Sequence, residues 1–123
     1  MKKTVLISYK TSFDAAHFIP NHPGKCSQLH GHTWHVEVTM KSYVDTETGQ
    51  YGLDFSELKK EIQTILVELD HRHLNDLLPY PSAENIALWL WSCLDEGSLL
   101  APLHRIRLWE SPDQYITFEG GYE

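Results

Sequence analysis

The sequence predicts an α+β fold, in which a four-stranded antiparallel sheet carries two helices on one face in the order ββααββ. Segments of alternating apolar and polar residues, which are typical of half-buried strands, lie near both ends of the chain. Between them lie two segments in which apolar residues recur at helical spacing. Strands on both sides of a helical middle favour an antiparallel sheet that is covered on one side.

Period-two alternation predicts the first two strands. The first covers residues 5–13 and runs towards His17. Residues 20–24 are rich in Pro and Gly and are expected to form a loop. The second strand is predicted over residues 32–41, where one side carries an apolar row of Trp34, Val36, Val38 and Met40.

Two amphipathic helices are predicted in the middle of the chain. Asp54, with Glu57 three residues later, resembles a capping box and begins a helix that ends near Asp70. The second helix begins at Ser82, and Gly97 is placed to stop it. The apolar faces are expected to contain Leu58, Ile62, Ile65, Leu66 and Leu69 in the first helix, and Ile86, Trp89, Leu90, Cys93 and Leu94 in the second.

A closing hairpin is predicted from residues 103–109 and 115–118, which are separated by turn-forming residues. The chain contains no internal repeat and no linker, so residues 1–123 are expected to form a single domain. An open sheet of four strands leaves its edges exposed, and proteins usually cover or pair such edges. We therefore expect the chain to form oligomers.

Composition and charge exclude several classes of function. The formal net charge is -7 and only 10 residues are Lys or Arg, which disfavours binding to duplex nucleic acid or to anionic membranes. No apolar run approaches the roughly 20 residues that span a bilayer, and the first residues turn polar too soon for a signal peptide. We expect a cytoplasmic protein in which Cys26 and Cys93 are reduced.

Three histidines predict a metal site. His30 and His32 lie two residues apart, so both imidazoles lie on the same side of an extended segment. His17 ends the first strand and adjoins them if the two strands pair antiparallel. Three nitrogen ligands with an open fourth position match a catalytic zinc site. However, His17 and His32 share the phase of the apolar residues in their strands, and either a bulge or a site between subunits would resolve this.

Cys26 has two possible roles in this site. It lies in a loop four residues before His30. As a fourth ligand it would close the site and make it structural, whereas as a free thiol it would be a nucleophile or a base beside the metal. His22 lies in the Pro- and Gly-rich loop and is expected to be solvent-exposed, while Cys93 is expected to pack in the core.

Two acidic residues are further candidates. Asp70 precedes His71 where the first helix is expected to end, and a carboxylate can fix the tautomer of an imidazole and raise its basicity. The alternative is a charged helix end, where the helix dipole stabilises a protonated histidine. Glu110 follows the apolar strand 103–109 and is either solvated or grips a heterocycle through paired hydrogen bonds.

Six motifs follow one another along the chain. They are Phe13-Asp14-Ala15-Ala16-His17, Cys26-Ser27-Gln28-Leu29-His30-Gly31-His32, Leu53-Asp54-Phe55, Leu69-Asp70-His71-Arg72-His73-Leu74-Asn75, Pro81-Ser82-Ala83-Glu84-Asn85-Ile86-Ala87 and Trp109-Glu110. Together they resemble the 6-pyruvoyltetrahydropterin synthase family of tunnelling-fold enzymes, and the resemblance covers nearly the whole chain. The order and spacing of the motifs make the resemblance specific, although His73 stands where an aromatic residue is more usual.

The resemblance implies a role for each candidate residue. Cys26 would be the catalytic proton acceptor, and His71, supported by Asp70, would be its relay partner. Glu110 would anchor the pterin ring and belong to the catalytic set. The ligands of a Zn²⁺ ion would be His17, His30 and His32. Three imidazoles also accept other first-row metals.

The resemblance also implies a reaction. The gap of three residues between Cys26 and His30 looks like the bacterial 6-carboxytetrahydropterin synthase branch, which acts in queuosine biosynthesis. Enzymes of that branch convert 7,8-dihydroneopterin triphosphate into 6-carboxy-5,6,7,8-tetrahydropterin, acetaldehyde and triphosphate. The alternatives are 6-pyruvoyltetrahydropterin synthase itself and a non-catalytic protein that binds zinc and a pterin. Cys26 disfavours family members of folate synthesis that use a glutamate in its place.

Finally, the resemblance implies an assembly and raises a question of charge. Tunnelling-fold enzymes form trimeric barrels that stack into hexamers with active sites at subunit interfaces, so we expect a homo-hexamer built as a dimer of trimers.

The expected substrate carries a triphosphate, whereas the chain is acidic. The candidates for a local basic patch are Lys10, Lys25, Arg105 and Arg107.

Overall fold

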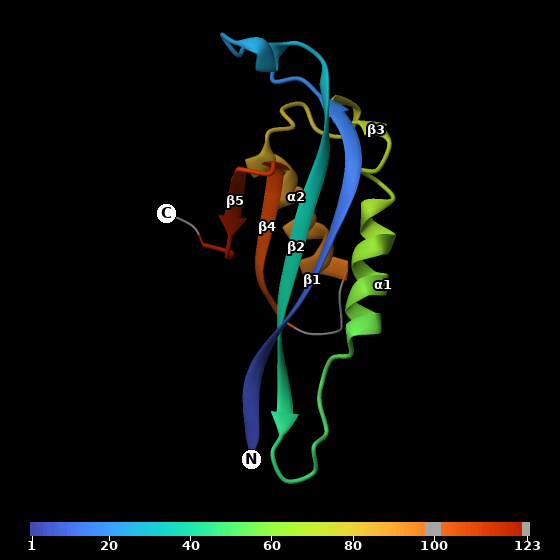
Figure 1. The fold of residues 1–123 in the computed structure, drawn as a ribbon, viewed down its shortest axis with the longest axis vertical. Coiled ribbons are helices and arrows are strands. Elements are labelled where there is room, and N and C mark those ends of the chain that lie inside the picture. Colours follow the sequence, from blue (N-terminus) through green and yellow to red (C-terminus); the bar gives the residue numbers. More distant parts are fainter. Residues whose placement is uncertain (98–101, 122–123) are drawn as a thin grey trace.

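The computed structural model describes residues 1–97 and 102–121 and has the predicted α+β architecture. Five strands form one sheet in the order β3-β1-β2-β4-β5, and helices α1 and α2 cover one of its faces (Figure 1). Two short 3₁₀ helices, η1 and η2, lie in the connections. The elements are β1 Lys2–His17, η1 Lys25–Ser27, β2 His30–Asp45, α1 Phe55–Leu66, β3 Arg72–His73, η2 Leu74–Asp76, α2 Ala83–Gly97, β4 Leu103–Ser111 and β5 Gln114–Phe118.

The prediction of four strands was wrong, because the sheet contains a fifth. Strand β3 has two residues and pairs in parallel with the end of β1, where Ala15 lies opposite Arg72 and Ala16 opposite His73. The element order is therefore ββαβαββ, and the sheet is antiparallel except at this pair. Two residues are too few to show any periodicity, but their pairing fixes the adjacent segment beside β1.

Strands β1 and β2 form a long antiparallel ribbon. The register runs without interruption from the pair Lys2 and Asp45 to the pair His17 and His30. Both strands are longer than predicted, so one end of the ribbon extends past the helices (Figure 1). At the other end, the ribbon brings the last residue of β1 directly opposite the first residue of β2.

Both predicted helix starts are confirmed by their caps. The carboxylate of Asp54 accepts a hydrogen bond from the backbone N–H of Ser56 at 3.0 Å. The hydroxyl oxygen of Ser82 accepts one from the backbone N–H of Asn85 at 3.2 Å. Helix α1 ends at Leu66, before the predicted end near Asp70, and α2 is described as far as Gly97.

The core lies between the sheet and the two helices. Helix α1 packs against β1, and α2 packs against β4 and β5. The buried side chains of the sheet alternate in phase, so the opposite, outer face of the sheet is not covered by either helix. The core includes Phe13, Trp34, Val36, Val38, Ile106 and Leu108 from the sheet, Leu58 and Ile62 from α1, and Ile86, Leu90 and Leu94 from α2.

The closing hairpin is present as predicted, with one irregularity. Strands β4 and β5 pair antiparallel, but their register shifts between Trp109 and Ser111. Glu110 lies at this shift, which is typical of a β-bulge that redirects a side chain. Among the described residues, no helix has the length and apolar character needed to span a membrane.

Candidate active site

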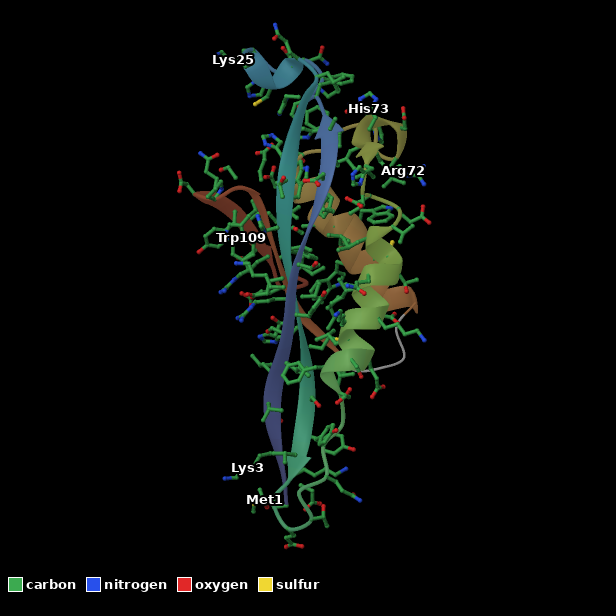
Figure 2. All side chains as sticks on the ribbon, turned by 45° about the vertical axis from the view of Figure 1, so that its right-hand side comes forward. Met1, Lys3, Lys25, Arg72, His73 and Trp109 are labelled. Carbon is green, nitrogen blue, oxygen red and sulfur yellow. The ribbon has the colours of Figure 1, made fainter. Side chains whose placement is uncertain are left out.

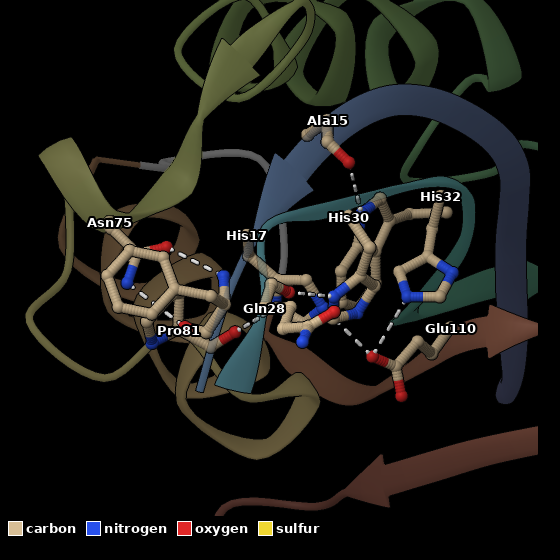
Figure 3. A network of polar contacts seen from close by, with 10 residues as sticks. Ala15, His17, Gln28, His30, His32, Asn75, Pro81 and Glu110 are labelled. Atoms are coloured by element: carbon tan, nitrogen blue, oxygen red, sulfur yellow. Dashed lines mark hydrogen bonds and ion pairs between the residues drawn. The ribbon is translucent and has the colours of Figure 1, made fainter. Parts of the chain in front are cut away.

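Four side chains from three strands converge at one end of the sheet. They are His17 at the end of β1, His30 and His32 at the start of β2, and Glu110 near the end of β4. One potential ligand atom from each lies within 4.8 Å of those of the others (Figure 3). The three predicted histidines are therefore brought together, and Glu110 joins them.

The phase of the histidines has a simple explanation. His17 continues the row of Phe13 and Ala15 on β1, and His32 continues the row of Trp34 on β2, so all three imidazoles lie on the buried face of the sheet. The pairing of β1 with β2 is regular across the site, so of the two explanations offered for this phase, a bulge in these strands does not apply. The histidines share the alternation of the buried residues because the site lies at the end of the hydrophobic core.

Backbone carbonyls determine which ring nitrogens face the site. His17 Nδ1 lies 2.7 Å from the carbonyl oxygen of Pro81, and His30 Nδ1 lies 2.7 Å from that of Gln28. A carbonyl only accepts hydrogen bonds, so each Nδ1 carries the proton and each neutral ring presents a lone pair at Nε2. Hydrogen bonds of this kind orient metal-binding histidines in known sites.

Glu110 completes a donor set that fits a cation. Its Oε1 lies 3.1 Å from His17 Nε2 and 3.3 Å from His32 Nε2. Both Nε2 atoms are buried, and neither has a hydrogen-bond partner among the described residues. A carboxylate oxygen and a bare nitrogen lone pair repel at these distances, so either a proton or a bound cation lies between Glu110 and each ring. Three imidazoles and one carboxylate are donors that zinc accepts.

Two pKa shifts are consistent with this donor set. Burial lowers the pKa of His32, and this outweighs the opposite effect of the Glu110 carboxylate, so the neutral ring that binds metals is favoured. The close contact with His17 holds the pKa of Glu110 below its usual value, so this carboxylate is ionised at neutral pH. Both shifts favour the form of the side chain that can bind a cation.

Cys26 lies beside this group without joining it. A hollow of about 460 Å³ is lined by Cys26 together with His30, His32 and Glu110. Cys26 is a half-buried free thiol. In the described part of the chain, the group of converging ligands contains the histidines and Glu110 but no cysteine. This arrangement favours the prediction of a free thiol beside the metal over that of a fourth ligand.

Asp70 and His71 form a hydrogen-bonded dyad. His71 Nδ1 donates to Asp70 Oδ2 at 2.9 Å, and Asp70 Oδ1 accepts the backbone N–H of Asp14 at 2.9 Å. The hydrogen bond to Asp70 raises the pKa of His71. The N–H of Asp14 and then the imidazole of His71 lower the pKa of Asp70. The dyad follows the turn that ends α1, where the N–H of Asp70 donates to the carbonyl of Leu66 at 2.9 Å, and its contacts with Asp14 hold it beside β1.

The dyad lies beside the outer face of the ribbon, whereas the histidine group lies on its inner face. Asp14, next to the dyad, hydrogen-bonds Thr33 across the outer face, and of the histidine group His32 also lines the hollow that contains His71. His71 lines a second hollow, which does not include Cys26, and Figure 2 shows the neighbouring residues of β3 beside the end of β1. Within one chain, the structure does not bring Cys26 and His71 together.

The basic residues are also divided between the two faces. Lys25 lines the hollow that contains Cys26. Arg105 and Arg107 lie on the outer face, where each approaches the carboxylate of Glu37 within 3.9 Å. Lys10 lies over the ring of Trp109 on that face. The four candidate cations therefore do not form one patch. Of the four, Lys25 is the residue that lies at the site.

Sequence reasoning missed two features of the site. It did not identify the carbonyl groups of Gln28 and Pro81 as partners of the imidazoles, because any residue supplies a carbonyl. It did not place Glu110 within reach of the histidines, because the bulge in β4 has no clear sequence signal. The motif that begins at Pro81 was the one available indication that this segment belongs to the site.

Comparisons with known proteins agree with the motifs and with the fold. The sequence profile of the 6-pyruvoyl tetrahydropterin synthase family matches residues 6–121. A putative 6-carboxy-5,6,7,8-tetrahydropterin synthase of Archaeoglobus fulgidus is 37% identical over 94% of this chain and 96% of its own. A dihydroneopterin monophosphate aldolase of Pyrococcus furiosus is 36% identical over 92% of this chain and 96% of its own.

A third relative and a solved structure complete the comparison. The 6-carboxy-5,6,7,8-tetrahydropterin synthase of Synechocystis is 39% identical over 85% of this chain and 86% of its own. The structure of the Caenorhabditis elegans 6-pyruvoyl tetrahydropterin synthase is similar with a TM-score of 0.84 at 26% identity, and 97% of each chain is covered. The chain therefore belongs to the 6-pyruvoyl tetrahydropterin synthase family of pterin-synthesising enzymes.

Proposed function

We propose that this protein is a zinc-dependent 6-carboxytetrahydropterin synthase of queuosine biosynthesis. It converts 7,8-dihydroneopterin triphosphate into 6-carboxy-5,6,7,8-tetrahydropterin, acetaldehyde and triphosphate. The observation that carries the proposal is the group of three imidazoles and Glu110, which opens into a hollow that also contains the thiol of Cys26. Relatives of Archaeoglobus and Synechocystis that carry this name support the choice of reaction.

His17, His30 and His32 hold the zinc ion in this proposal. The ion, when bound, supplies a Lewis acid that lowers the pKa of hydroxyl groups on the substrate side chain. The carbonyls of Pro81 and Gln28 keep two of the rings turned towards the ion. A catalytic zinc site keeps one position open for substrate. Glu110 therefore binds the substrate and is not a fourth ligand of the zinc ion.

Glu110 anchors the pterin ring. Its carboxylate is half-buried, ionised and directed into the hollow, so it can accept paired hydrogen bonds from a 2-amino-4-oxopyrimidine ring. Ser111 and Gln114 line the same hollow and offer further polar contacts. Lys25 is placed to contact the triphosphate, because it is the cation that lines this hollow.

Cys26 and the Asp70–His71 dyad move the protons. Cys26 accepts a proton from the substrate, and His71 exchanges a second proton with it while Asp70 orients the ring. Because Cys26 and His71 lie apart within one chain, we infer that the dyad that acts with Cys26 comes from a second copy of the chain. This requirement supports the homo-hexamer, with active sites at subunit interfaces, that the family resemblance implies. We place this single-domain protein in the cytoplasm.

The reaction is tested by supplying the zinc-loaded protein with 7,8-dihydroneopterin triphosphate without oxygen and identifying products by mass spectrometry. We expect 6-carboxytetrahydropterin together with acetaldehyde. A 6-pyruvoyl product would instead assign the activity named for the Drosophila relative, which is 34% identical over 80% of this chain. Turnover of the monophosphate alone would assign the aldolase activity named for the Pyrococcus relative. Zinc binding without turnover of either substrate would indicate a pterin-binding protein.

A further inference from the structure

Asp14 contacts both members of the dyad and has no role in the proposal above. Its backbone carbonyl accepts the N–H of His71 at 2.6 Å, and its backbone N–H donates to Asp70 at 2.9 Å. Its own carboxylate accepts a hydrogen bond from the hydroxyl of Thr33 at 2.6 Å. Thr33 lies directly opposite Asp14 in the β1–β2 ribbon, so the carboxylate is tethered to the outer face of the sheet.

The tether leaves the Asp14 carboxylate facing the imidazole of His71. Oxygen atoms of Asp14 and Asp70 and a ring nitrogen of His71 all lie within 4.8 Å of one another. His71 has a positive φ of 58°, a conformation that non-glycine residues rarely adopt. The backbone N–H of His71 contacts Asp14 and its ring contacts Asp70, and these two contacts hold His71 in this conformation. The ring cannot move away from the two carboxylates unless these contacts break.

The other charged or titratable side chains around His71 come from two strands. Arg72 and His73 of β3 and His32 of β2 line the same hollow as His71 and Asp14. Of these, Arg72 is a permanent cation and opposes protonation of the ring. Asp70 from the α1–β3 connection and Asp14 from β1 are the negative groups in contact with it. Two carboxylates therefore favour the protonated form of the His71 ring, and one cation opposes it.

We propose that Asp14 is a positioning residue of the dyad, whose carboxylate, held by Thr33, keeps the His71 ring as a proton-donating imidazolium beside Asp70. This inference rests on the proposed function for its catalytic meaning. It assigns an order to the proton transfers: Cys26 removes a proton from the substrate as the base, and the already protonated His71 returns one. The Asp14 carboxylate acts through space on His71 and does not touch the reacting atoms.

The charge of Asp14 can be removed while its shape is kept. In Asp14→Asn, the amide oxygen still accepts from Thr33, and both backbone contacts with the dyad remain. The loss of one negative charge within 4.8 Å of the ring lowers the pKa of His71. The pKa is measured by NMR titration of the His71 ring in the substrate-free protein, so the result does not depend on the reaction.

Matched variants separate charge from structure. Asp76→Asn removes a carboxylate from η2, close to His73, and should leave the pKa of His71 unchanged. Asp14→Ser keeps a hydroxyl for Thr33 and should reproduce the shift if Asp14→Asn is insoluble. An unchanged His71 pKa in a folded Asp14 variant would overturn the proposal, as would an equal shift in Asp76→Asn.

Kinetics then connect the shift with catalysis. If His71 donates a proton, the alkaline limb of the pH–kcat/KM profile moves to lower pH in Asp14→Asn by the amount found by NMR. A purely structural effect would lower kcat at every pH without moving the limb. If the pKa of His71 shifts by NMR but the alkaline limb of the kinetic profile does not move, Asp14 still acts on the charge of His71, and the assignment of His71 as the proton donor is overturned. If wild-type protein shows no turnover, the proposed function fails while the NMR result still stands.

Discussion

Cys26 and the histidines differ in what each should contribute to the site. Because Cys26 lines the hollow but is absent from the converging group of ligands, the Cys26→Ala variant should retain zinc and lose turnover. Loss of a general base typically costs about 10²–10⁴-fold in rate. Metal content by mass spectrometry and product formation are measured on the same sample. A variant that lost its zinc would identify Cys26 as a ligand after all.

Lys25 should affect the binding of phosphate and little else. Lys25→Met removes the cation that lines the hollow and should raise KM for the triphosphate by about tenfold, equivalent to about 1.4 kcal/mol. The matched control is Lys10→Met, which removes a lysine on the outer face. Competition by 7,8-dihydroneopterin, which lacks phosphate, should be unaffected in both variants. Equal effects of the two substitutions on KM would show only a general influence of net charge.

At the scale of elements, the segment between α1 and β3 depends on the ionised form of Asp70. The pKa of Asp70 is depressed in the folded state by its contacts with Asp14 and His71, so its contribution to stability is present above the unfolded pKa of about 3.9. That contribution is lost as the pH falls through the folded value. In urea titrations, Asp70→Asn should lose less stability than wild type as the pH falls below about 4.

His71 titrates in the opposite sense. Its pKa is raised in the folded state, so the stability contributed by the protonated His71 ring is present below about pH 6.5, as long as Asp70 stays ionised, and is lost as the pH rises through the folded value. Asp70→Asn should remove this loss as well. A variant whose stability follows the wild-type pH dependence in both ranges would show that the hydrogen bonds of Asp70 do not hold this segment.

The elements that sequence analysis predicted well are those with a repeating or capped pattern. The apolar rows of β1 and β2 and the caps at Asp54 and Ser82 have local physical causes, so they can be recognised without the fold. The end of α1 at Leu66 was less predictable, because Leu69 continues the apolar face and is buried outside the helix. Strand β3 exists only through its pairing with β1 and leaves no local pattern.

The same distinction applies to the site. The convergence of His17 with His30 follows from pairing two strands end to start, which sequence reasoning can do. The position of Glu110 depends on a bulge in β4 and on the order of strands in the sheet. The separation of Cys26 from His71 depends on which hollow each residue lines. The roles of these residues stay predictions until they are tested.

At the scale of the whole molecule, the long edge of β1 is paired, within residues 1–97 and 102–121, at Ala15 and Ala16 alone, and β5 forms the other edge of the described sheet. Exposed edges of this kind favour pairing between copies. Since the family resemblance implies a hexamer, we expect light scattering to give the mass of six chains. A monomer with full activity would contradict the assembly and also the sharing of active sites.

Mixing two inactive variants tests that sharing directly. Cys26→Ala and His71→Ala should each be inactive. If Cys26 and His71 act from different copies, co-refolding equal amounts should restore about a quarter of the sites, because random neighbours combine one intact Cys26 with one intact His71. The control is a mixture of Cys26→Ala with the variant that carries both substitutions, which contains no intact Cys26. Recovery no greater than in this control would place the reacting pair within one chain.

The closed end of the β1–β2 ribbon has a consequence for how such a protein can change over time. Residues 18–29 form a loop whose two ends, His17 and His30, are fixed opposite each other by the ribbon. The entropy of closing a loop grows only slowly with its length, so residues can be gained or lost here at low cost. Such changes would move Cys26 while leaving the histidines in place. The reactive group can thus vary independently of the metal ligands, and new chemistry can arise without loss of the metal site.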